Sequence, residues 1–407
     1  MSTSPESRWL AGLAAQGELN WGEAAVVEVC GRGDGVRLVR GATRAAPLPP
    51  LPRTFSVTSA TNADFAQLRA AVQTWAQHLL HLLRLATDEV GVSWHEIICV
   101  GLIEPWWHWG IWSDGGFGFP WPMSAWLAEM TGWSIAHSFA LRDLAAGGHS
   151  RCVTAATDWI LFHSQHEPRL ILHLGEDILL HSLAPGQDWS AIRAAMLIPG
   201  LAVLDRLTAA LTGRPDNPDR SGHLAVQGRL IPDLLSRWLA HPVLLTRHRR
   251  FQIRTPFDSP WARATSELAR QRGWPPVDVL CTACHWLVQN IASARSELGL
   301  QDSNLRVLVS GLGCRNGFLW QLLQDKLRPA IVQRSDDFGV AADAALAVRA
   351  ALLAALLLDQ VPAGVPQASG SSGIRLLGQW TPGSLSNWSR CLHWMVTGRE
   401  PLIWEDS

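Results

Sequence analysis

The sequence contains no tyrosine and a single lysine, Lys326, although it has 22 tryptophans and 34 lysines and arginines together. Both biases extend over the whole chain, so they indicate compositional drift rather than a local function. The formal net charge is −1, and no long run of one sign is present. Because a nucleic-acid surface needs an extended basic face, we expect no nucleic-acid partner and favour a small-molecule ligand.

The sequence also lacks an export signal and a membrane-spanning segment. The N-terminus, MSTSPESRWLAGLAAQ, carries a glutamate where a signal peptide has a cationic start and an unbroken apolar core. The most apolar stretch, residues 342–360, is interrupted by Asp343 and Arg349 and falls short of the roughly 20 residues that cross a bilayer. It predicts a buried core helix. We therefore expect a cytoplasmic protein without a membrane partner, whose seven cysteines are reduced.

The segment Cys281-Thr-Ala-Cys284-His285 has the C-x-x-C-H spacing that attaches a c-type haem. It lies within residues 275–298, however, where apolar residues recur at helical spacing. No other cysteine or histidine pair has the spacing of a zinc site. We therefore predict a helix whose cysteines are small buried hydrophobes, and neither a haem nor a metal site.

Helical and strand patterns alternate along both halves of the chain, which predicts an α/β architecture with two lobes. The predicted boundaries are 1–118 with about 375–407 for the N-terminal lobe, 119–374 for the C-terminal lobe, and 384–407 for an added tail with an amphipathic helix. The predicted elements include two hairpins, 24–30 with 35–41 and 169–175 with 177–183, helices 62–90, 123–133 and 153–164, strands 96–102 and 306–313, and a loop at 140–150.

The stretch EPWWHWGIWSDGGFGFPWP, residues 104–122, is dense in tryptophan, glycine and proline. Indole rings stack on the faces of sugars, so one interpretation is a carbohydrate-binding surface. The alternative is a well-packed loop between domains, which the general abundance of tryptophan favours. The candidates for sugar stacking are Trp106, Trp107, Trp109 and Trp112.

Two glycine turns are candidates for the functional site. In LRDLAAGGHS, residues 141–150, Asp143 precedes a Gly-Gly pair, so its carboxylate could transfer protons beside a ligand that approaches the glycine backbone. Alternatively Asp143 caps a helix or pairs with Arg142 in solvent. In VLVSGLGCRNGFL, residues 307–319, two glycines join a strand to a helix start, where free amides can hold a phosphate or the glycines simply allow tight packing. The spacing matches neither the Rossmann fingerprint nor the P-loop.

These motifs occur in order with others that together resemble the anhydro-N-acetylmuramic acid kinase family. Residues 142–150 are similar to the family's R-D-[IV]-A-A-G-G-Q-G-A-P, and residues 310–316 to its C-G-G-G-A-R-N turn. The family's D-x-x-G-x-x-A-x-x-G resembles 219–228, and its aspartate-glycine segment resembles 336–347. Its closing V-T-G-A-x-x-x-x-V-L-G-x-x-x-P-G resembles 364–383. The correspondence covers almost the whole chain.

The resemblance implies a cytoplasmic sugar kinase with the two-lobed, actin-like ATPase fold and a cleft between the lobes. Such kinases use ATP and Mg²⁺ to open the 1,6-anhydro ring of anhydro-N-acetylmuramic acid, an amino sugar recycled from the cell wall. Water attacks the anomeric carbon while the ring oxygen takes the γ-phosphoryl group. Family members are often dimers, which makes a homodimer a candidate state.

The resemblance also assigns residues to the site. Asp143 matches the general base, a task that suits a carboxylate because it can take the proton of the attacking water. No residue is assigned as a metal ligand. Those assigned to the substrate are Arg142, Gly147, Gly148 and His149, and those assigned to the nucleotide are Gly12, Gly17, Gly200, Gly311, Gly313, Arg315 and Asn316.

Several ligand-facing turns depart from the family's pattern. The first phosphate turn, G-L-M-S-G-T-S-x-D-G, corresponds to residues 12–21, which lack its hydroxyl and aspartate side chains and carry Glu18, whose charge repels a triphosphate. In the second, D-T-G-P-G-N, Met196 replaces the acidic residue for Mg²⁺ or its waters. The family's H-G-Q-T corresponds to 103–106, and its N-I-G-G-I-A-N to 173–179.

Two main hypotheses follow. The first is an active or altered sugar kinase, supported by Asp143, the Gly147-Gly148 pair and the 310–316 turn. The second is a pseudokinase, a binding or scaffolding protein on the same fold, supported by the missing phosphate and magnesium groups. On these losses we predict that catalysis is absent or very weak. A third hypothesis is a carbohydrate-binding protein that uses the tryptophans of 104–122.

Overall fold

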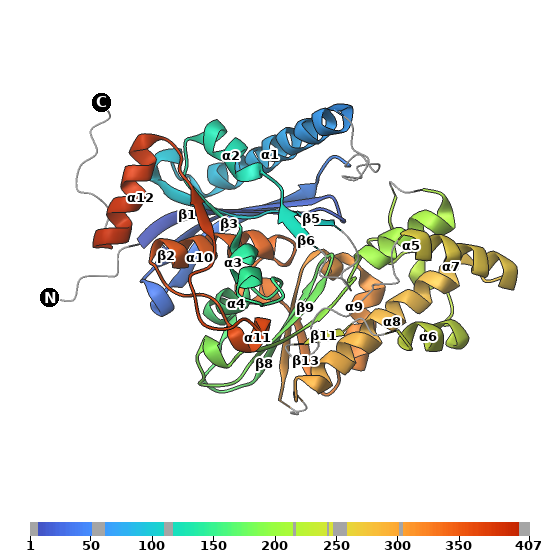
Figure 1. Ribbon diagram of the computed structural model, residues 1–407. Helices are drawn as coiled ribbons and strands as arrows, with labels where there is room; N and C mark the ends of the chain where they lie inside the picture. The colour runs from blue at the N-terminus through green and yellow to red at the C-terminus, as the bar shows by residue number, and fades with distance from the viewer. Residues whose placement is uncertain are drawn as a thin grey trace.

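The fold is taken from a computed structural model of the 407-residue chain. The structure describes residues 7–50, 62–109, 117–214, 217–241, 244–246, 259–300 and 304–398. Within these ranges the chain forms two six-stranded sheets and a separate two-stranded hairpin, with helices on the sheets (Figure 1). The two sheets are the centres of two lobes, so the predicted two-lobed α/β architecture is confirmed.

The first sheet has the strand order β14-β7-β4-β1-β2-β3. Strands β1 to β3 form an antiparallel meander, β4 runs parallel to β1, β7 runs parallel to β4, and β14 closes the edge antiparallel to β7. Both faces of β1 and β2 are buried, as expected for strands that are covered on two sides. The bounds are β1 Ser7–Gln16, β2 Trp21–Cys30, β3 Arg37–Pro47, β4 Ile97–Ile103, β7 Ile135–His137 and β14 Gln379–Thr381.

The second sheet has the order β11-β10-β9-β8-β12-β13. Strands β8 to β11 pair antiparallel, whereas β12 and β13 extend the sheet in parallel from β8. The bounds are β8 Arg169–Leu174, β9 Ile178–Leu183, β10 Arg193–Leu197, β11 Leu244–Thr246, β12 Arg306–Ser310 and β13 Ile331–Arg334, and the separate hairpin consists of β5 Trp106–Trp109 and β6 Phe117–Pro120.

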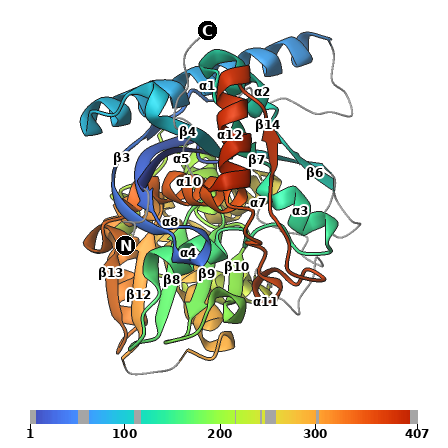
Figure 2. The ribbon, with the colours of Figure 1, turned by 90° about the vertical axis from the view of Figure 1, so that its left-hand side faces the viewer.

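Helix α10, Ala345–Leu358, lies between the two sheets (Figures 1 and 2). All of its residues are buried, and it belongs to one apolar cluster with Leu10 of the first sheet and Ile171 and Leu308 of the second. The helix can approach the first sheet closely because glycines face it. A Cβ at Gly12 or at Gly101 would lie 1.9 Å from a carbonyl oxygen of the helix. The predicted buried core helix is therefore confirmed.

Replacing Gly12 by alanine should lower the free energy of unfolding by about 1–3 kcal/mol, because the new methyl group would overlap the carbonyl oxygen of Ala347. Urea denaturation measures this effect. Gly35→Ala is the matched control, because nothing lies within 4 Å of a Cβ at Gly35. Equal free energies of unfolding for Gly12→Ala and Gly35→Ala would contradict the close approach of α10 to β1.

The remaining helices cover the outer parts of the two sheets. Helices α1 and α2 pack on the first sheet, and α12 packs on β4 and α10. Helices α5, α6, α8 and α9 build the core of the second lobe. Within the described ranges, no helix has the length and apolar content that crossing a membrane requires. The bounds are α1 Asn62–Val90, α2 Met123–Thr131, α3 Phe139–Ala145, α4 Ala155–Phe162, α5 Ala202–Thr212, α6 Pro232–Leu239, α7 Ser259–Arg272, α8 Pro276–Glu297, α9 Gly317–Lys326, α11 Pro366–Ser369 and α12 Leu385–Thr397.

Most predicted elements are confirmed, including both hairpins, the long helix α1 and the amphipathic helix α12 of the tail. The structure differs from the predicted elements and boundaries at three points. Residues 140–150 are not a loop throughout, since α3 runs to Ala145. No strand was predicted at β1, and the first sheet includes β7, which lies past residue 118, where we placed the end of the N-terminal lobe.

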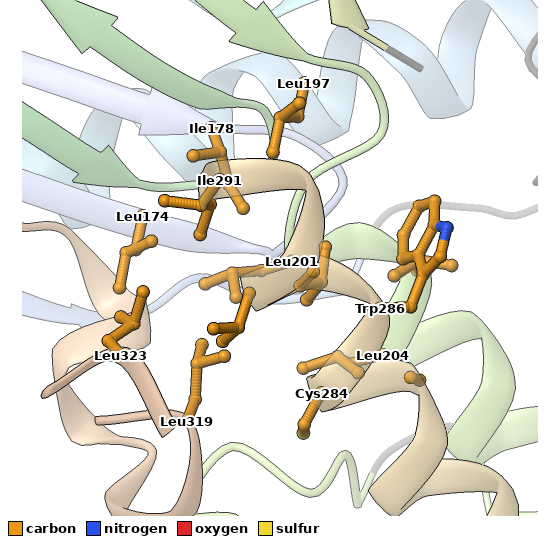
Figure 3. Close-up of a cluster of buried hydrophobic side chains, with 14 of the residues drawn as sticks. Leu174, Ile178, Leu197, Leu201, Leu204, Cys284, Trp286, Ile291, Leu319 and Leu323 are labelled. Carbon is orange, nitrogen blue, oxygen red and sulfur yellow. The ribbon is translucent and has the colours of Figure 1, made fainter. Parts of the chain in front are cut away.

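The CTACH segment lies on α8, as predicted (Figure 3). Cys281 and Cys284 are free and buried, and Cys284 packs in the cluster that contains Leu319. Burial raises the pKa of both thiols, so they stay protonated. A protonated buried thiol behaves as a small hydrophobe, which confirms the predicted framework role.

The tryptophan-rich segment contains the hairpin of β5 and β6. Trp112 lies outside the described residues, and the side chains of Trp106, Trp107 and Trp109 are not described either. The carbohydrate-binding interpretation of this segment therefore stays a prediction.

Candidate active site

Asp143 lies in the last turn of α3, between a strand and a glycine turn. Strand β7 ends at His137, and Ser138 leads into the helix with a positive φ of 55°. The helix ends at Ala145, Ala146 caps it, and Gly147 follows with a φ of 79°, a conformation that glycine adopts without strain. The Asp143 side chain is buried, so the end of the helix holds this carboxylate inside the protein.

Two hydrogen-bond donors orient the carboxylate of Asp143. The amide of Ser150 donates to Oδ2 at 2.9 Å, and the hydroxyl of Ser369 donates to Oδ1 at 2.6 Å. Gly148 packs against the same group, because a Cβ there would lie 2.3 Å from Oδ2. The two donors fix the orientation of the carboxylate, and each oxygen retains a second lone pair that can accept a proton.

His149 joins the Asp143 turn to the segment around α11. Its amide donates to the carbonyl of Ser369 at 3.1 Å, and its Nε2 lies 3.1 Å from the carbonyl of Ala368. Burial lowers the pKa of His149, so the ring is neutral and Nε2 carries the donated proton. Of the other residues predicted for the substrate, Arg142 and Gly147 are exposed. The turn therefore has an inner side around the carboxylate and an outer side open to solvent.

Gly12, predicted to contact the nucleotide, is not part of a turn. It lies within β1, paired with Ala25 of β2 and Gly101 of β4, and α10 covers it. The prediction is therefore wrong, since neighbouring strands and a helix surround this residue. The actual turn between β1 and β2 spans residues 17–20, so Gly17 remains at the predicted place.

The turn between β1 and β2 meets the turn between β8 and β9. The amide of Glu18 donates to Oε2 of Glu176 at 3.0 Å, and the amide of Glu176 donates to Oε1 of Gln16 at 3.1 Å. Gln16 in turn donates to the buried Glu23 at 2.9 Å. Burial raises the pKa of Glu23 to about 8, so this carboxyl group is mostly protonated at pH 7.

Gly200 holds the β10–α5 connection against these two turns, and we call the place where the three segments meet the corner. Its amide donates to the carbonyl of Glu176 at 2.7 Å, and a Cβ there would lie 2.7 Å from the backbone of Asp177. Met196 is buried within β10. The β1–β2 turn, which contains Gly17, and the β10–α5 connection, which contains Gly200, therefore both contact Glu176.

The turn after β12 is built mainly for packing. A Cβ at Gly311 would lie 2.4 Å from the carbonyl oxygen of Leu174, and one at Gly313 would lie 2.6 Å from the Leu174 side chain. Asn316 is buried and caps α9 by accepting from the amide of Leu319 at 2.9 Å. These contacts favour the packing alternative for the three residues, which we had assigned to the nucleotide.

Arg315 is the residue of this turn that reaches the corner. Its guanidinium lies 4.7 Å from the ring centroid of Trp21, directly after the β1–β2 turn, and pairs with Asp343. A second arginine joins the two halves of the site, because Arg151 follows the Asp143 turn and contacts Asp177 at 2.5 Å. The Asp143 turn and the corner are thus parts of one connected region.

The corner is rich in carboxylates. Burial raises the pKa of Glu176 to about 7, and the charges of Asp177 and Glu18 add to this effect. Burial also raises the pKa of Asp205 on α5 to about 6. Arginines compensate part of the charge, since Arg206 contacts Glu18 at 2.7 Å. Among the described residues, no group of three His, Cys, Asp or Glu side chains could hold a metal ion.

The partners of the predicted groups were not predicted from the sequence. Ser369 lies within the 364–383 segment, so the closing motif could have pointed to it. Glu176 stands at a glycine of the family's N-I-G-G-I-A-N, and that departure was a signal. Gln16 and Glu23 carry no local signal, because their roles depend on the meeting of two turns.

The comparisons with known proteins agree with these motifs. The family model for anhydro-N-acetylmuramic acid kinase matches residues 53–383. The anhydro-N-acetylmuramic acid kinase of Gloeobacter violaceus is 27% identical over 91% of this chain and 98% of its own length. The enzyme of the same name from Cupriavidus pinatubonensis is 30% identical over 67% of this chain and 71% of its own length.

A looser likeness exists among solved structures. The activator of 2-hydroxyisocaproyl-CoA dehydratase from Clostridium difficile, with bound ADPNP, has a TM-score of 0.44 and 10% identity over 85% of this chain and 94% of its own. The assignment rests instead on the family model, which matches well over half of the chain. The chain belongs to the anhydro-N-acetylmuramic acid kinase family, and its two sheets and buried central helix are those of a two-lobed sugar kinase.

Proposed function

We propose that this chain binds a 1,6-anhydro amino sugar at the Asp143 turn and phosphorylates it with ATP, but slowly. The observation that carries the proposal is the buried Asp143 carboxylate, oriented by Ser150 and Ser369 in a chain of this family. In the family's reaction water attacks the anomeric carbon, whose bond to the bridging oxygen breaks. That oxygen takes the γ-phosphoryl group, and ADP leaves. Asp143 takes the proton of the attacking water.

The nucleotide half of the site supports a slow reaction. A thioether does not bind Mg²⁺, so Met196 cannot replace the family's acidic residue. Glu18 and Glu176 place carboxylates at the turn where a phosphate is expected. The residues of this half therefore fit Mg²⁺ and a triphosphate poorly, whereas those around Asp143 fit their assigned task.

A second candidate is a protein that binds the sugar without phosphorylating it. The specific observation in its favour is that the amide of Glu18 already donates to the carboxylate of Glu176. The two candidates make different predictions, because only the first forms a phosphorylated product.

The test is incubation of the purified protein with 1,6-anhydro-N-acetylmuramic acid and Mg·ATP, followed by mass spectrometry. The proposed function predicts a product that has gained one water and one phosphoryl group, at a rate that increases with enzyme concentration. Calorimetric binding of the sugar without any product would support the second candidate. Absence of both binding and product would contradict the use of this sugar altogether.

Replacing Gly148 by alanine should reduce turnover of the anhydro sugar by up to about 100-fold, since the new methyl group would displace the Asp143 carboxylate from its position. Initial rates at saturating sugar measure this loss. Gly35→Ala, which adds a methyl group in open space, should keep the wild-type rate. A wild-type rate in Gly148→Ala would mean that Asp143 does not act in the position that the structure shows.

A further inference from the structure

Glu176 places a carboxylate on the backbone of the β1–β2 turn. Its Oε2 accepts a hydrogen bond from the amide of Glu18 at 3.0 Å, although the two residues are 158 positions apart. A free backbone amide at a tight turn is a natural donor to an anion. Here the anion that this amide contacts is part of the protein.

The backbone of Glu176 is fixed on two sides, so the position of its carboxylate is built into the fold. Its amide donates to Gln16 at 3.1 Å, and its carbonyl accepts from Gly200 at 2.7 Å. Gln16 is itself held by the buried Glu23 at 2.9 Å. The β1–β2 turn, the β8–β9 turn and the β10–α5 connection therefore meet at this residue.

The charge of Glu176 is the least compensated in the corner. Glu18 pairs with Arg206 at 2.7 Å, and Asp177 pairs with Arg151 at 2.5 Å. Glu176 makes no ion pair with the described residues, and the amide of Glu18 is its hydrogen-bond donor. A phosphate that approached this turn would meet a carboxylate where it needs a donor.

We propose that the Glu176 carboxylate occupies the anion position of the β1–β2 turn and so sets the selectivity of this site against nucleoside triphosphates. This inference rests on the proposed function, because it explains why the nucleotide half works poorly. A triphosphate must displace the carboxylate from the Glu18 amide and then bind beside its negative charge. The residue at this position, more than the loss of the turn's hydroxyls, limits the affinity for ATP.

The test is calorimetric titration of the full-length protein with Mg·ATP at pH 8. Glu176→Gly removes the side chain, and Glu176→Gln keeps its size while removing its charge. Both should bind Mg·ATP at least about tenfold more tightly than the wild type, because repulsion of the polyanion is relieved. Glu129→Gln is the charge-matched control, because Glu129 is exposed on α2, and it should bind as the wild type does.

The pH dependence provides a second readout. The groups that face Glu176 are Asp177 on its own turn, Glu18 across the contact and Arg151 after the Asp143 turn. Protonation of Glu176 removes the repelling charge, so wild-type affinity for Mg·ATP should rise as the pH falls through about 7. The ratio of the Glu176→Gln affinity to the wild-type affinity should therefore shrink toward one at pH 6.

Equal affinities of the wild type, Glu176→Gly and Glu176→Gln at pH 8 would overturn the inference. Thermal melting of each variant shows whether it is folded, and Glu176→Gln still tests the inference if Glu176→Gly is unfolded. The outcome is separable from that of the proposed function. Tighter ATP binding by Glu176→Gly without any sugar phosphate would support the inference and contradict the proposed function. Turnover of the sugar at the wild-type rate with unchanged ATP affinity would contradict the inference and support the proposed function.

Discussion

Asp143→Asn should lower the rate of anhydro-sugar phosphorylation by about 10²–10⁴-fold, the usual contribution of a positioned general base. The amide has nearly the same shape as the carboxylate but cannot take the proton of the attacking water. The asparagine oxygen can still accept from the Ser150 amide, and its NH2 group can donate to the Ser369 hydroxyl, so we expect the turn to keep its structure. Initial rates of sugar phosphate formation with the wild type and the variant measure the effect.

The matched control for this change is Asp188→Asn. Asp188 carries an exposed carboxylate that accepts from the amide of Ser190 at 2.8 Å, so its replacement should leave the rate unchanged. A rate in Asp143→Asn within a factor of about three of the wild type would exclude Asp143 as the base, given the magnitude expected of this role.

Arg349→Met should lower the free energy of unfolding by about 3–5 kcal/mol, because it leaves a buried carboxylate without its cation. Arg349 is 1% exposed and lies on α10, where its Nε donates to Asp158 of α4 at 2.6 Å. Asp158 also contacts His181 of β9 at 2.6 Å. Burial alone would raise the pKa of Asp158, but Arg349 and His181 outweigh it and hold this pKa below its usual value. Urea denaturation measures the loss.

The double variant Arg349→Met with Asp158→Asn distinguishes an unpaired charge from lost packing. If the loss comes from the unpaired carboxylate, neutralising Asp158 should recover part of the stability. A double variant that is no more stable than Arg349→Met alone would show that the arginine stabilises the protein by packing and its other contacts. Those contacts are the hydroxyl of Ser310 at 3.2 Å and Nδ1 of His173 at 3.4 Å.

The parts of the fold that could be predicted are those with a local pattern. Helix α1 has a regular apolar spacing over Asn62–Val90, and α10 is apolar except for Arg349 because sheets cover it on both sides. The Asp143 turn was also predictable, since its aspartate and two glycines are close in the sequence. Even there, residues 140–150 were predicted as a loop, and the short helix α3 was missed.

The parts that could not be predicted depend on residues far apart in the sequence. Ser369 contacts Asp143 across 226 positions, and Arg349 contacts Asp158 across 191. The Gly12 assignment failed for a related reason. A glycine in a phosphate motif and a glycine under a packed helix are identical in the sequence, and only the position of α10 distinguishes them.

Sugar-dependent release of ADP is the decisive test of whether this protein phosphorylates the anhydro sugar through Asp143. The wild-type protein is incubated with Mg·ATP, with and without 1,6-anhydro-N-acetylmuramic acid, and ADP and sugar phosphate are quantified together. We predict slow ADP release that requires the sugar, equals the sugar phosphate in amount and disappears in Asp143→Asn. ADP release that is the same without the sugar, or sugar phosphate that persists in Asp143→Asn, would contradict the account.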